Sequence, residues 1–121
     1  MGKTDAKQVL GKKGEEQAQQ HLKSLSYAII VTNYRAACGE IDIIAKDNQT
    51  LVFIEVKTRR NLNFGSPLEA VNLRKQLKIR RTALHYLATQ SVAYRGYRFD
   101  VISLLATSTG IWQIDHVVNA F

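Results

Sequence analysis

The sequence predicts an α/β protein, a three-layer sandwich in which helices cover a mixed sheet of about five strands. Its apolar spacing switches between helix and strand periods in the order α-β-β-β-α-β-β along the chain. The long helical segment between the third and fourth strands implies a right-handed crossover, which sets those two strands parallel. At 121 residues, 45% of them hydrophobic, the chain is expected to form a single domain over residues 1–121.

The N-terminal half is expected to hold one helix and three strands. Residues 1–8 are polar and are expected to form a flexible tail. From about Leu10 to Leu25, small and apolar residues recur at spacings of three and four, which is typical of a helix packed on a core. The β-branched and apolar segments that follow predict strands over 27–35, 38–46 and 51–58, the last two joined by the turn "KDNQT".

The C-terminal half begins with a helix-start signal at residues 66–69. Ser66 is a suitable N-cap, Pro67 suits the first turn, and Glu69 stands at the capping-box position. The helix that follows is expected to carry one apolar face formed by Ala70, Leu73, Leu77, Leu84 and Ala88 and widened by Ile79, Ala83 and Tyr86. Two further strands are predicted over 97–106 and 111–118.

Charge and composition narrow the class of partner. Lysine and arginine number 17 against 10 aspartate and glutamate residues, which gives a formal net charge of +7. Such a balance on a small domain favours a polyanionic partner, with nucleic acid ahead of a membrane surface. No apolar run approaches the roughly 20 residues that a membrane-spanning helix needs. Cys38 has no second cysteine to pair with, so a reducing, cytoplasmic setting is expected.

The strands over 38–46 and 51–58 are expected to form a hairpin whose register follows from their apolar residues. If Asp47 opposes Thr50, one face of the hairpin carries only apolar pairs. These pairs are Ala45–Val52, Ile43–Ile54 and Ile41–Val56. A shift by one residue would set Asp42 against Ile54, so the first register is favoured.

The other face of this hairpin then gathers charge at the end away from the turn. Asp42 is expected opposite Glu55, and Glu40 opposite Lys57. Carboxylates on facing residues about 5 Å apart repel each other by about 3 kcal/mol at an effective dielectric near 20. Either one carboxylate holds a proton or a cation lies between them. Because oxygen ligands suit hard divalent ions, the pair predicts a site for Mg²⁺ or Mn²⁺, with Lys57 placed to hold a phosphate or an attacking water.

Glu15 is a candidate third acid for this site. It lies three residues before Ala18 and seven before Leu22, which puts it on the inward stripe of the first helix. Glu16 lies about 100° further round the helix and is expected to face water. A carboxylate on the inner side of a helix that packs on the sheet can reach the acidic end of the hairpin.

Plainer interpretations of the same residues stay open. Asp42, Glu55 and Lys57 can form a structural ion network, and Glu15 can be a first-turn acid favoured by the helix dipole. The basic character of the second helix can be solvated charge. Cys38 is expected to be a small buried residue rather than a nucleophile. No ligand-like spacing relates the histidines, which are expected at the surface or in packing: His21, His85 and His116.

Several segments together resemble a known family. They are "GKKGEEQA", "GEIDIIA", "FIEVKTR", "GSPLEAV", "YRFDVI" and the terminal "NAF". In these segments the chain resembles the YraN family of small bacterial proteins. The pattern Asp42-x12-Glu55-Val56-Lys57 after a helix with Glu15 resembles the PD-(D/E)xK nuclease superfamily, which includes restriction enzymes and Holliday-junction resolvases. Ile41 departs from the pattern, which has proline at that position.

The resemblance implies a restriction-endonuclease-like fold and divalent-metal-dependent cleavage of DNA phosphodiester bonds. Carried over, Asp42, Glu55 and Glu15 would bind Mg²⁺ or Mn²⁺, and Lys57 would orient the attacking water or stabilise charge. Candidates to hold flanking phosphates are Arg35, Arg59, Arg60, Lys75 and Lys78. No base-reading residues stand out, which favours structure-selective over sequence-specific cutting. By analogy, a homodimer would serve to cut two strands.

Two other classes of function are alternatives to a nuclease. The rival is a non-catalytic nucleic-acid-binding or adaptor protein that keeps the nuclease fold, since fold alone does not establish catalysis. A small metabolic enzyme is disfavoured, because the sequence shows no glycine-rich phosphate loop and no nucleophile–base pair. DNA is preferred to RNA as the nucleic acid.

Overall fold

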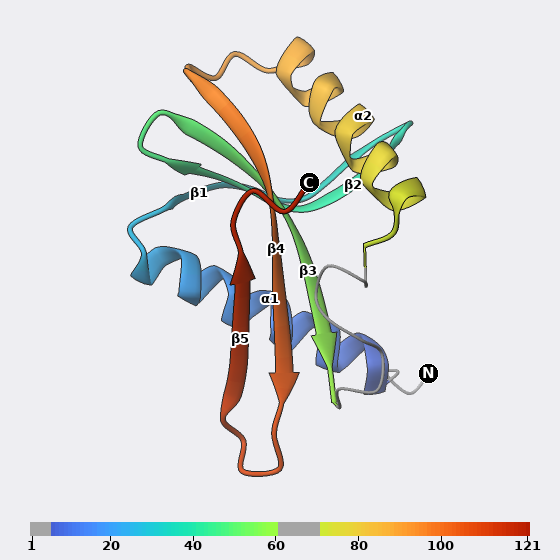
Figure 1. The fold of residues 1–121 in the computed structure, drawn as a ribbon, viewed down its shortest axis with the longest axis vertical. Helices are drawn as coiled ribbons and strands as arrows, with labels where there is room; N and C mark the ends of the chain where they lie inside the picture. The colour runs from blue at the N-terminus through green and yellow to red at the C-terminus, as the bar shows by residue number, and fades with distance from the viewer. Residues whose placement is uncertain (1–5, 61–70) are drawn as a thin grey trace, which may run out of the picture.

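The computed structural model of the chain describes residues 6–60 and 71–121 (Figure 1). Its elements are α1 (Ala6–Ser24), β1 (Ala28–Ala36), β2 (Gly39–Asp47), β3 (Thr50–Arg59), α2 (Leu73–Thr89), β4 (Gly96–Ala106) and β5 (Trp112–Val117). Within these ranges the strands form a five-stranded sheet in the order β1-β2-β3-β4-β5. Neighbouring strands are antiparallel, except that β3 and β4 are parallel. The predicted fold class, element order and parallel pair are therefore confirmed.

One helix packs on each face of the sheet, so the fold has three layers (Figure 1). Between α1 and the sheet lies a cluster of buried apolar residues: Ala18, Leu22, Ile43, Ala45, Val52, Ile54, Ile102 and Leu104. On the α2 side lies a second cluster: Ile41, Ile44, Leu51, Phe53, Val71, Ile79, Ala83, Tyr86, Phe99 and Val101. Because β3 is central and covered on both faces, residues 51–55 are all buried. Glu55 thus ends the most completely covered stretch of the sheet.

The predicted strands agree with the structure within one residue at every end. Turn signals such as "KDNQT" mark these ends well, because Asn48 adopts the left-handed φ of 54° that a tight hairpin turn requires. No helix within the described ranges is long and apolar enough to cross a membrane.

The first helix begins earlier than the sequence predicts. It starts at Ala6 rather than near Leu10, so residues 6–8, expected in a flexible tail, are helical. Lysine and glutamine are good helix formers, and they extend the helix beyond the apolar stripe that served to locate it. At the other end the helix stops at Ser24, and Leu25 is 46% exposed instead of packing inward.

The predicted start of the second helix, at residues 66–69, lies outside the described residues, as does Ala70. Within the described part, α2 begins at Leu73, and Asn72 is its N-cap. The Asn72 side-chain oxygen accepts a hydrogen bond from the backbone N–H of Lys75 at 2.9 Å. Val71 and Asn72 are not helical, so the prediction that the helix runs through them is wrong.

The buried face of α2 is not the one that its leucines predict. Leu73, Leu77 and Leu84 are 69%, 47% and 55% exposed, and Ala88 is exposed as well. The residues that α2 buries are Ile79, Thr82, Ala83 and Tyr86. Small side chains at 82 and 83 let the helix lie close to the sheet, and the Tyr86 ring meets Phe53 edge to face. Fit to the sheet therefore decides which face packs, and the number of leucines does not.

Candidate active site

The hairpin of β2 and β3 opens where its charged residues begin. Its register runs as predicted from the turn to Ile43–Ile54, and the ladder ends at that pair. Asp42 and Glu55 are therefore not paired directly across the hairpin, which corrects the sequence-based expectation. Instead, the backbone N–H of Val56 donates to Oδ2 of Asp42 at 2.8 Å. The Asp42 side chain takes the place of a backbone partner between the two strands.

The alternation of side chains also breaks at this point. Ile41 packs in the cluster on the α2 side, whereas Ile43 and Val56 pack on the α1 side. On the neighbouring strand β1, Asn33 has a left-handed φ of 53°, which an extended strand does not contain. The predicted pairing of Ile41 with Val56 is therefore wrong. Register arguments assume regular strands, and β1 and β2 are both irregular where they pass Asp42.

The opening forms a cleft of about 340 Å³ that both helices help to line. Its lining consists of Leu10, Gly11 and Glu15 of α1, Glu40 and Asp42 of β2, residues 55–58 of β3, and Lys75 of α2. All the residues predicted to be catalytic thus border one space. Because the strands separate there, side chains from the layers on both faces of the sheet meet in it. Glu40, expected opposite Lys57, pairs instead with Arg35 at 3.3 Å.

Gly14 sets how closely α1 approaches this cleft. A Cβ at position 14 would lie 2.0 Å from Oγ1 of Thr58 on β3, so only glycine permits the observed contact between helix and strand. The contact brings the following residue, Glu15, to the cleft, whereas Glu16 is exposed as predicted. In the "GEE" segment, Gly14 therefore allows the close packing of helix on strand, and Glu15 contributes to the site.

Glu15 is half-buried, and its carboxylate accepts a hydrogen bond from the side chain of Asn33. Burial raises the pKa of Glu15, and the negative charges of Glu55 and Glu40 raise it further against the effect of that hydrogen bond. Sequence reasoning missed Asn33. The signal that could have found it is an asparagine inside a β-branched strand, where that residue type is depleted.

Glu55 is the most deeply buried acid of the cleft, with 7% of its surface exposed. Its Oε1 lies 2.7 Å from Nζ of Lys75 and 3.4 Å from Nζ of Lys57. Burial lowers the pKa of Lys57, and the neighbouring Lys75 lowers it further. Burial also disfavours charge on Lys75, but hydrogen bonds to Glu55 and Lys57 raise its pKa overall. Lys75, predicted only to hold a flanking phosphate, is therefore part of the acidic cleft itself.

The surroundings of Asp42 strongly disfavour its ionised form. Burial raises its pKa to about 7, helped by the negative charges of Glu55 and Glu15. The N–H of Val56 and the ammonium of Lys75 act in the opposite direction and do not overcome these effects. An aspartate that resists ionisation up to neutral pH lies in a place that favours an added positive charge.

The donors of the cleft fit a hard divalent ion in their chemistry. The carboxylates of Glu15, Asp42 and Glu55 offer only oxygen ligands, which Mg²⁺ and Mn²⁺ prefer. Within residues 6–60 and 71–121, no group of three His, Cys, Asp or Glu residues is assembled closely enough to hold a metal ion as it stands. Glu55 is held by Lys75, so metal binding would have to replace this ion pair. The metal site stays a prediction.

The residues predicted to hold flanking phosphates fall into two groups. Arg35, Lys75 and Lys78 line a second pocket that adjoins the cleft. Arg59 ends β3 and Arg60 follows it, and neither lines the cleft or this pocket. The structure thus brings part of the predicted set to the site region.

Comparison with known proteins identifies the family. Residues 14–104 match the model of the uncharacterised protein family UPF0102. A UPF0102 protein of Geotalea daltonii is 47% identical over 120 residues, which cover 99% of this chain and 94% of that protein. The chain belongs to the UPF0102 family. A UPF0102 protein of Nocardia farcinica is 47% identical over 115 residues (95% and 91% coverage), and one of Caldicellulosiruptor saccharolyticus is 42% identical over 116 residues (95% and 98% coverage).

Membership in the UPF0102 family confirms the family-level resemblance seen in the sequence. The matched range includes Glu15, Asp42, Glu55 and Lys57. The family's name carries no activity, so the function of this UPF0102 cleft has to be argued from its geometry and chemistry.

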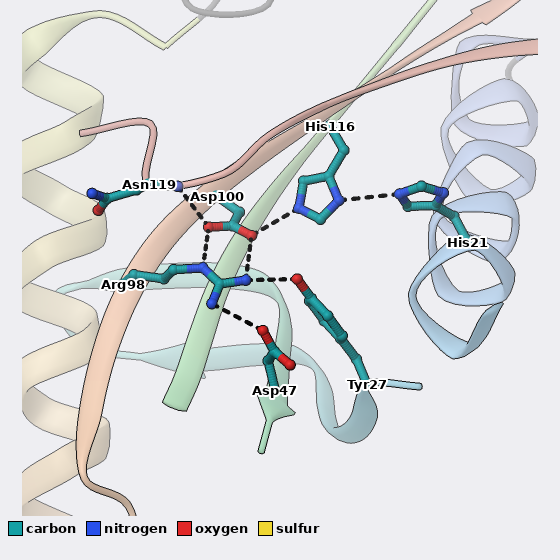
Figure 2. Close-up of polar contacts among 7 residues, drawn as sticks. All are labelled: His21, Tyr27, Asp47, Arg98, Asp100, His116 and Asn119. Atoms are coloured by element: carbon teal, nitrogen blue, oxygen red, sulfur yellow. Dashed lines mark hydrogen bonds and ion pairs between the residues drawn. The ribbon is translucent and has the colours of Figure 1, made fainter. Parts of the chain in front are cut away.

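A second polar cluster of the UPF0102 chain surrounds Asp100, which is fully buried on β4 (Figure 2). Its Oδ1 accepts from Nε of Arg98 and from the backbone N–H of Asn119, both at 3.0 Å. Its Oδ2 accepts from Nε2 of His116 at 2.7 Å and from Nη2 of Arg98 at 3.3 Å. Burial alone would raise the pKa of Asp100, but the hydrogen bonds from His116, Arg98 and Asn119 lower it overall.

The same cluster links three further elements. Arg98 donates to Asp47 at 3.2 Å and to the Tyr27 hydroxyl at 2.6 Å. Because a carboxylate only accepts, Nε2 of His116 carries a proton, and its other ring nitrogen, Nδ1, shares a hydrogen bond of 3.1 Å with Nε2 of His21. The sequence signal for this network is an arginine and an aspartate two residues apart, which places both on one face of a strand.

Proposed function

We propose that this UPF0102 protein is a divalent-metal-dependent nuclease that hydrolyses phosphodiester bonds of DNA. The observation that carries the proposal is one cleft where Glu15, Asp42 and Glu55 meet from α1, β2 and β3, with Lys57 among them. Glu55 and Glu15 lie close enough to Asp42 for their negative charges to raise its pKa, so the acids of the cleft repel one another. The resemblance of their spacing to PD-(D/E)xK nucleases supports the same function.

Glu15, Asp42 and Glu55 are the residues that would hold Mg²⁺ or Mn²⁺. Bound there, the ion would lower the pKa of a water molecule and neutralise charge on the phosphate. Glu55 would give up its contact with Lys75, and the ammonium of Lys75 would then be free to meet a phosphate oxygen.

Hydrolysis also requires a positively charged group near the phosphate, because negative charge increases on the phosphate oxygens during the reaction. The oxygen of a water molecule bonds to phosphorus as the bond from phosphorus to the leaving oxygen breaks. The water gives up one proton and the leaving oxygen gains one, so the step is balanced. Lys57, whose Nζ is 3.4 Å from Oε1 of Glu55, lies where it can donate to a phosphate oxygen of the reacting group.

Basic residues beside the cleft support a nucleic acid as the substrate. Arg35 and Lys78 lie next to it, and the chain carries a net charge of +7. Contacts of this kind give a salt-dependent affinity for phosphates that is independent of sequence. Such contacts favour recognition of the shape of the DNA over recognition of its base sequence. Cutting both strands of a duplex would take two copies of the chain.

One observation favours the alternative, a nucleic-acid-binding or adaptor protein without catalysis. Lys75 holds Glu55 at 2.7 Å, and this ion pair satisfies the most buried acid without a metal ion. In such a protein the cleft would be a stable ionic cluster, and the basic surface alone would bind DNA.

Cleavage assays separate these two functions. Purified protein is incubated with single-stranded, branched and duplex DNA in Mg²⁺, Mn²⁺ or EDTA. We expect metal-dependent cutting that falls by about 100-fold or more in Glu55→Gln and in Lys57→Ala. Glu15→Gln should lose activity as well, whereas Glu16→Gln, which changes the exposed neighbour on the same helix, should retain it.

Each outcome of the assay bears on the proposal. Cutting that persists unchanged in Glu55→Gln would mean a contaminant or a different site. Binding of DNA without metal-dependent cutting would favour the adaptor.

A further inference from the structure

A second pocket, of about 470 Å³, adjoins the acidic cleft. It is lined by Arg35, Ala36, Ala37, Cys38, Gly39 and Glu40 from the β1–β2 turn region, and by Lys75, Lys78 and Ile79 from α2. Glu40 and Lys75 border both the pocket and the cleft, so the two spaces lie side by side. A volume of this size is within the roughly 300–1,000 Å³ of small-ligand sites.

The walls of the pocket are held in a fixed position. A Cβ at Gly39 would lie 2.8 Å from Oγ1 of Thr82, so the β1–β2 turn packs directly on α2. Gly39 has a φ of 152°, and the buried Thr82 hydroxyl donates to the carbonyl of Lys78 at 2.8 Å. The contact locks the turn against the helix and leaves the pocket between them, next to the site of the proposed chemistry.

The chemistry of the pocket is divided between an apolar wall and a cationic rim. The wall consists of small or apolar side chains: Ala36, Ala37, Cys38 and Ile79. Arg35 pairs with Glu40, and Lys75 pairs with Glu55. Lys78 has no carboxylate partner among the described residues, and with Lys75, Asn72 and Arg74 it borders a further hollow of about 290 Å³. Positive charge therefore continues from the cleft along the first half of α2.

We propose that this pocket holds one unpaired nucleotide of the DNA strand beside the scissile phosphate. The base would lie against the apolar wall, and its phosphate would meet Lys78 and Arg35. The proposal rests on the proposed function, because it takes the neighbouring cleft as the place of cleavage. It names the substrate class more closely: DNA with at least one unpaired nucleotide next to the cut.

The shape of the pocket explains why the nucleotide is unpaired. A base inside a duplex presents only its edge and must leave the stack before its face can meet a protein wall. Single-stranded and branched DNA offer such bases without that cost. Among residues 6–60 and 71–121, no aromatic ring lines the pocket, so the base would meet small aliphatic side chains that do not distinguish one base from another.

Cys38 gives a direct reporter of this pocket, because it is the only cysteine of the chain. Its alkylation by N-ethylmaleimide is followed in EDTA, where no cutting occurs, with three probes: a single-stranded oligonucleotide, the same backbone with abasic sites, and a blunt duplex. At about ten times the Kd of the single strand, measured by fluorescence anisotropy, alkylation should slow about tenfold. The abasic strand and the duplex, at the same concentration, should slow it less than about twofold.

Two control variants isolate the pocket. In Cys38→Ser/Ser108→Cys the thiol moves to the exposed turn between β4 and β5, far from α2 in Figure 1, and no probe should protect it. Lys78→Gln should weaken protection by the single strand several-fold. Arg81→Gln removes the same charge from the same helix outside the pocket and should leave protection within about twofold of the original chain.

The outcomes separate this inference from the proposed function. Equal protection by the intact and abasic strands would show phosphate contact alone and would overturn the base pocket. Protection by the duplex as strong as by the single strand, or none by a saturating single strand, would overturn it as well. Protection by the single strand alone, in a protein that never cuts DNA with Mg²⁺ or Mn²⁺, would support the nucleotide pocket and contradict the proposed nuclease function.

Discussion

Asp42 and Asp100 are both aspartates on the strands of one sheet, and their surroundings move their pKa values in opposite directions. Asp100 meets Arg98, His116 and a backbone N–H, and its pKa is lowered although it is fully buried. Asp42 meets one backbone N–H and two other acids, and its pKa is raised to about 7. Burial disfavours charge in both places. Only the cluster around Asp100 supplies enough donors to reverse that effect.

The difference separates a polar cluster that stabilises the fold from one that is suited to binding. Around Asp100 both oxygens of the carboxylate accept hydrogen bonds, so removing any member leaves another without its partner. Around Asp42 negative charge is in excess, so removing it relieves repulsion. Loss of stability on mutation and loss of function on mutation should therefore separate between the two regions.

The largest expected effect is from Asp100→Asn. The substitution leaves Arg98 and His116 without their buried carboxylate and should lower the free energy of unfolding by about 3–5 kcal/mol. Urea unfolding at pH 7 measures it. Asp47→Asn is the matched control, because Asp47 contacts the same arginine with a side chain that is 33% exposed, and it should cost less than about 1 kcal/mol. Equal losses in the two variants would contradict the view that Asp100 organises the network.

The second-largest expected effect is from a change at Gly14, whose contact with β3 positions Glu15. Gly14→Ala should lower the free energy of unfolding by about 1–3 kcal/mol, because the new methyl group meets Thr58 at a distance no packing allows. Gly11→Ala is the control on the same helix. A Cβ there meets nothing within 4 Å, so it should raise stability by up to about 1 kcal/mol through helix propensity.

A double-mutant cycle sharpens the Gly14 prediction. Thr58→Ala removes the hydroxyl and methyl groups that the new Cβ would meet. Gly14→Ala/Thr58→Ala should then cost less than the sum of the single changes by at least about 0.5 kcal/mol. Strict additivity would show that α1 does not depend on this contact.

Much of the fold could be predicted from periodicity and turn chemistry. The strand ends and the register near the turn follow from alternating apolar residues and from "KDNQT", which act locally. The face of α2 could not be predicted in this way, because Leu73, Leu77 and Leu84 form a regular stripe that the structure exposes. Its packing depends on how Thr82 fits against Gly39, a contact between residues far apart in the chain.

The composition of the candidate site was predictable, but its geometry was not. Charged residues inside apolar runs mark Asp42 and Glu55, and helical spacing places Glu15 beside them. The separation of β2 from β3 was missed, because it depends on the irregular backbone at Asn33 and on the hydrogen bond between Asp42 and Val56. The partnership of Lys75 with Glu55 was missed as well, since it joins two elements across the crossover.

Asp42→Asn should act in the opposite sense to Asp100→Asn. The folded pKa of Asp42 is raised above its unfolded value, so its contribution to stability is complete below about pH 4 and is lost as pH rises through about 7. Removing the charge should therefore stabilise the metal-free protein by about 1–2 kcal/mol at pH 8 and by less than about half as much at pH 5. Thermal unfolding in EDTA at the two pH values measures this. A loss of stability at pH 8 would mean that the hydrogen bond to Val56 outweighs the repulsion.

Binding of a divalent ion should also distinguish the original chain from Asp42→Asn. An ion that binds only the folded protein raises the melting temperature by mass action. Adding Mn²⁺ in place of EDTA at pH 8 should raise the melting temperature of the original chain clearly and that of Asp42→Asn much less. An equal rise in both would place the ion elsewhere.

The smallest expected effect concerns His21, whose pKa is lowered by burial and by the neighbouring His116. A histidine with a lowered pKa binds protons more readily when the chain unfolds, so its contribution to stability is present above about pH 6.5 and is lost as pH falls through the folded pKa. Between pH 7.5 and 5.5 this trend opposes that of Asp42, which gains stability on acidification. His21→Gln should therefore make stability rise more steeply as the pH falls, and Asp42→Asn should remove the rise. Identical pH slopes in the two variants would show that the clusters do not differ in the way their contacts imply.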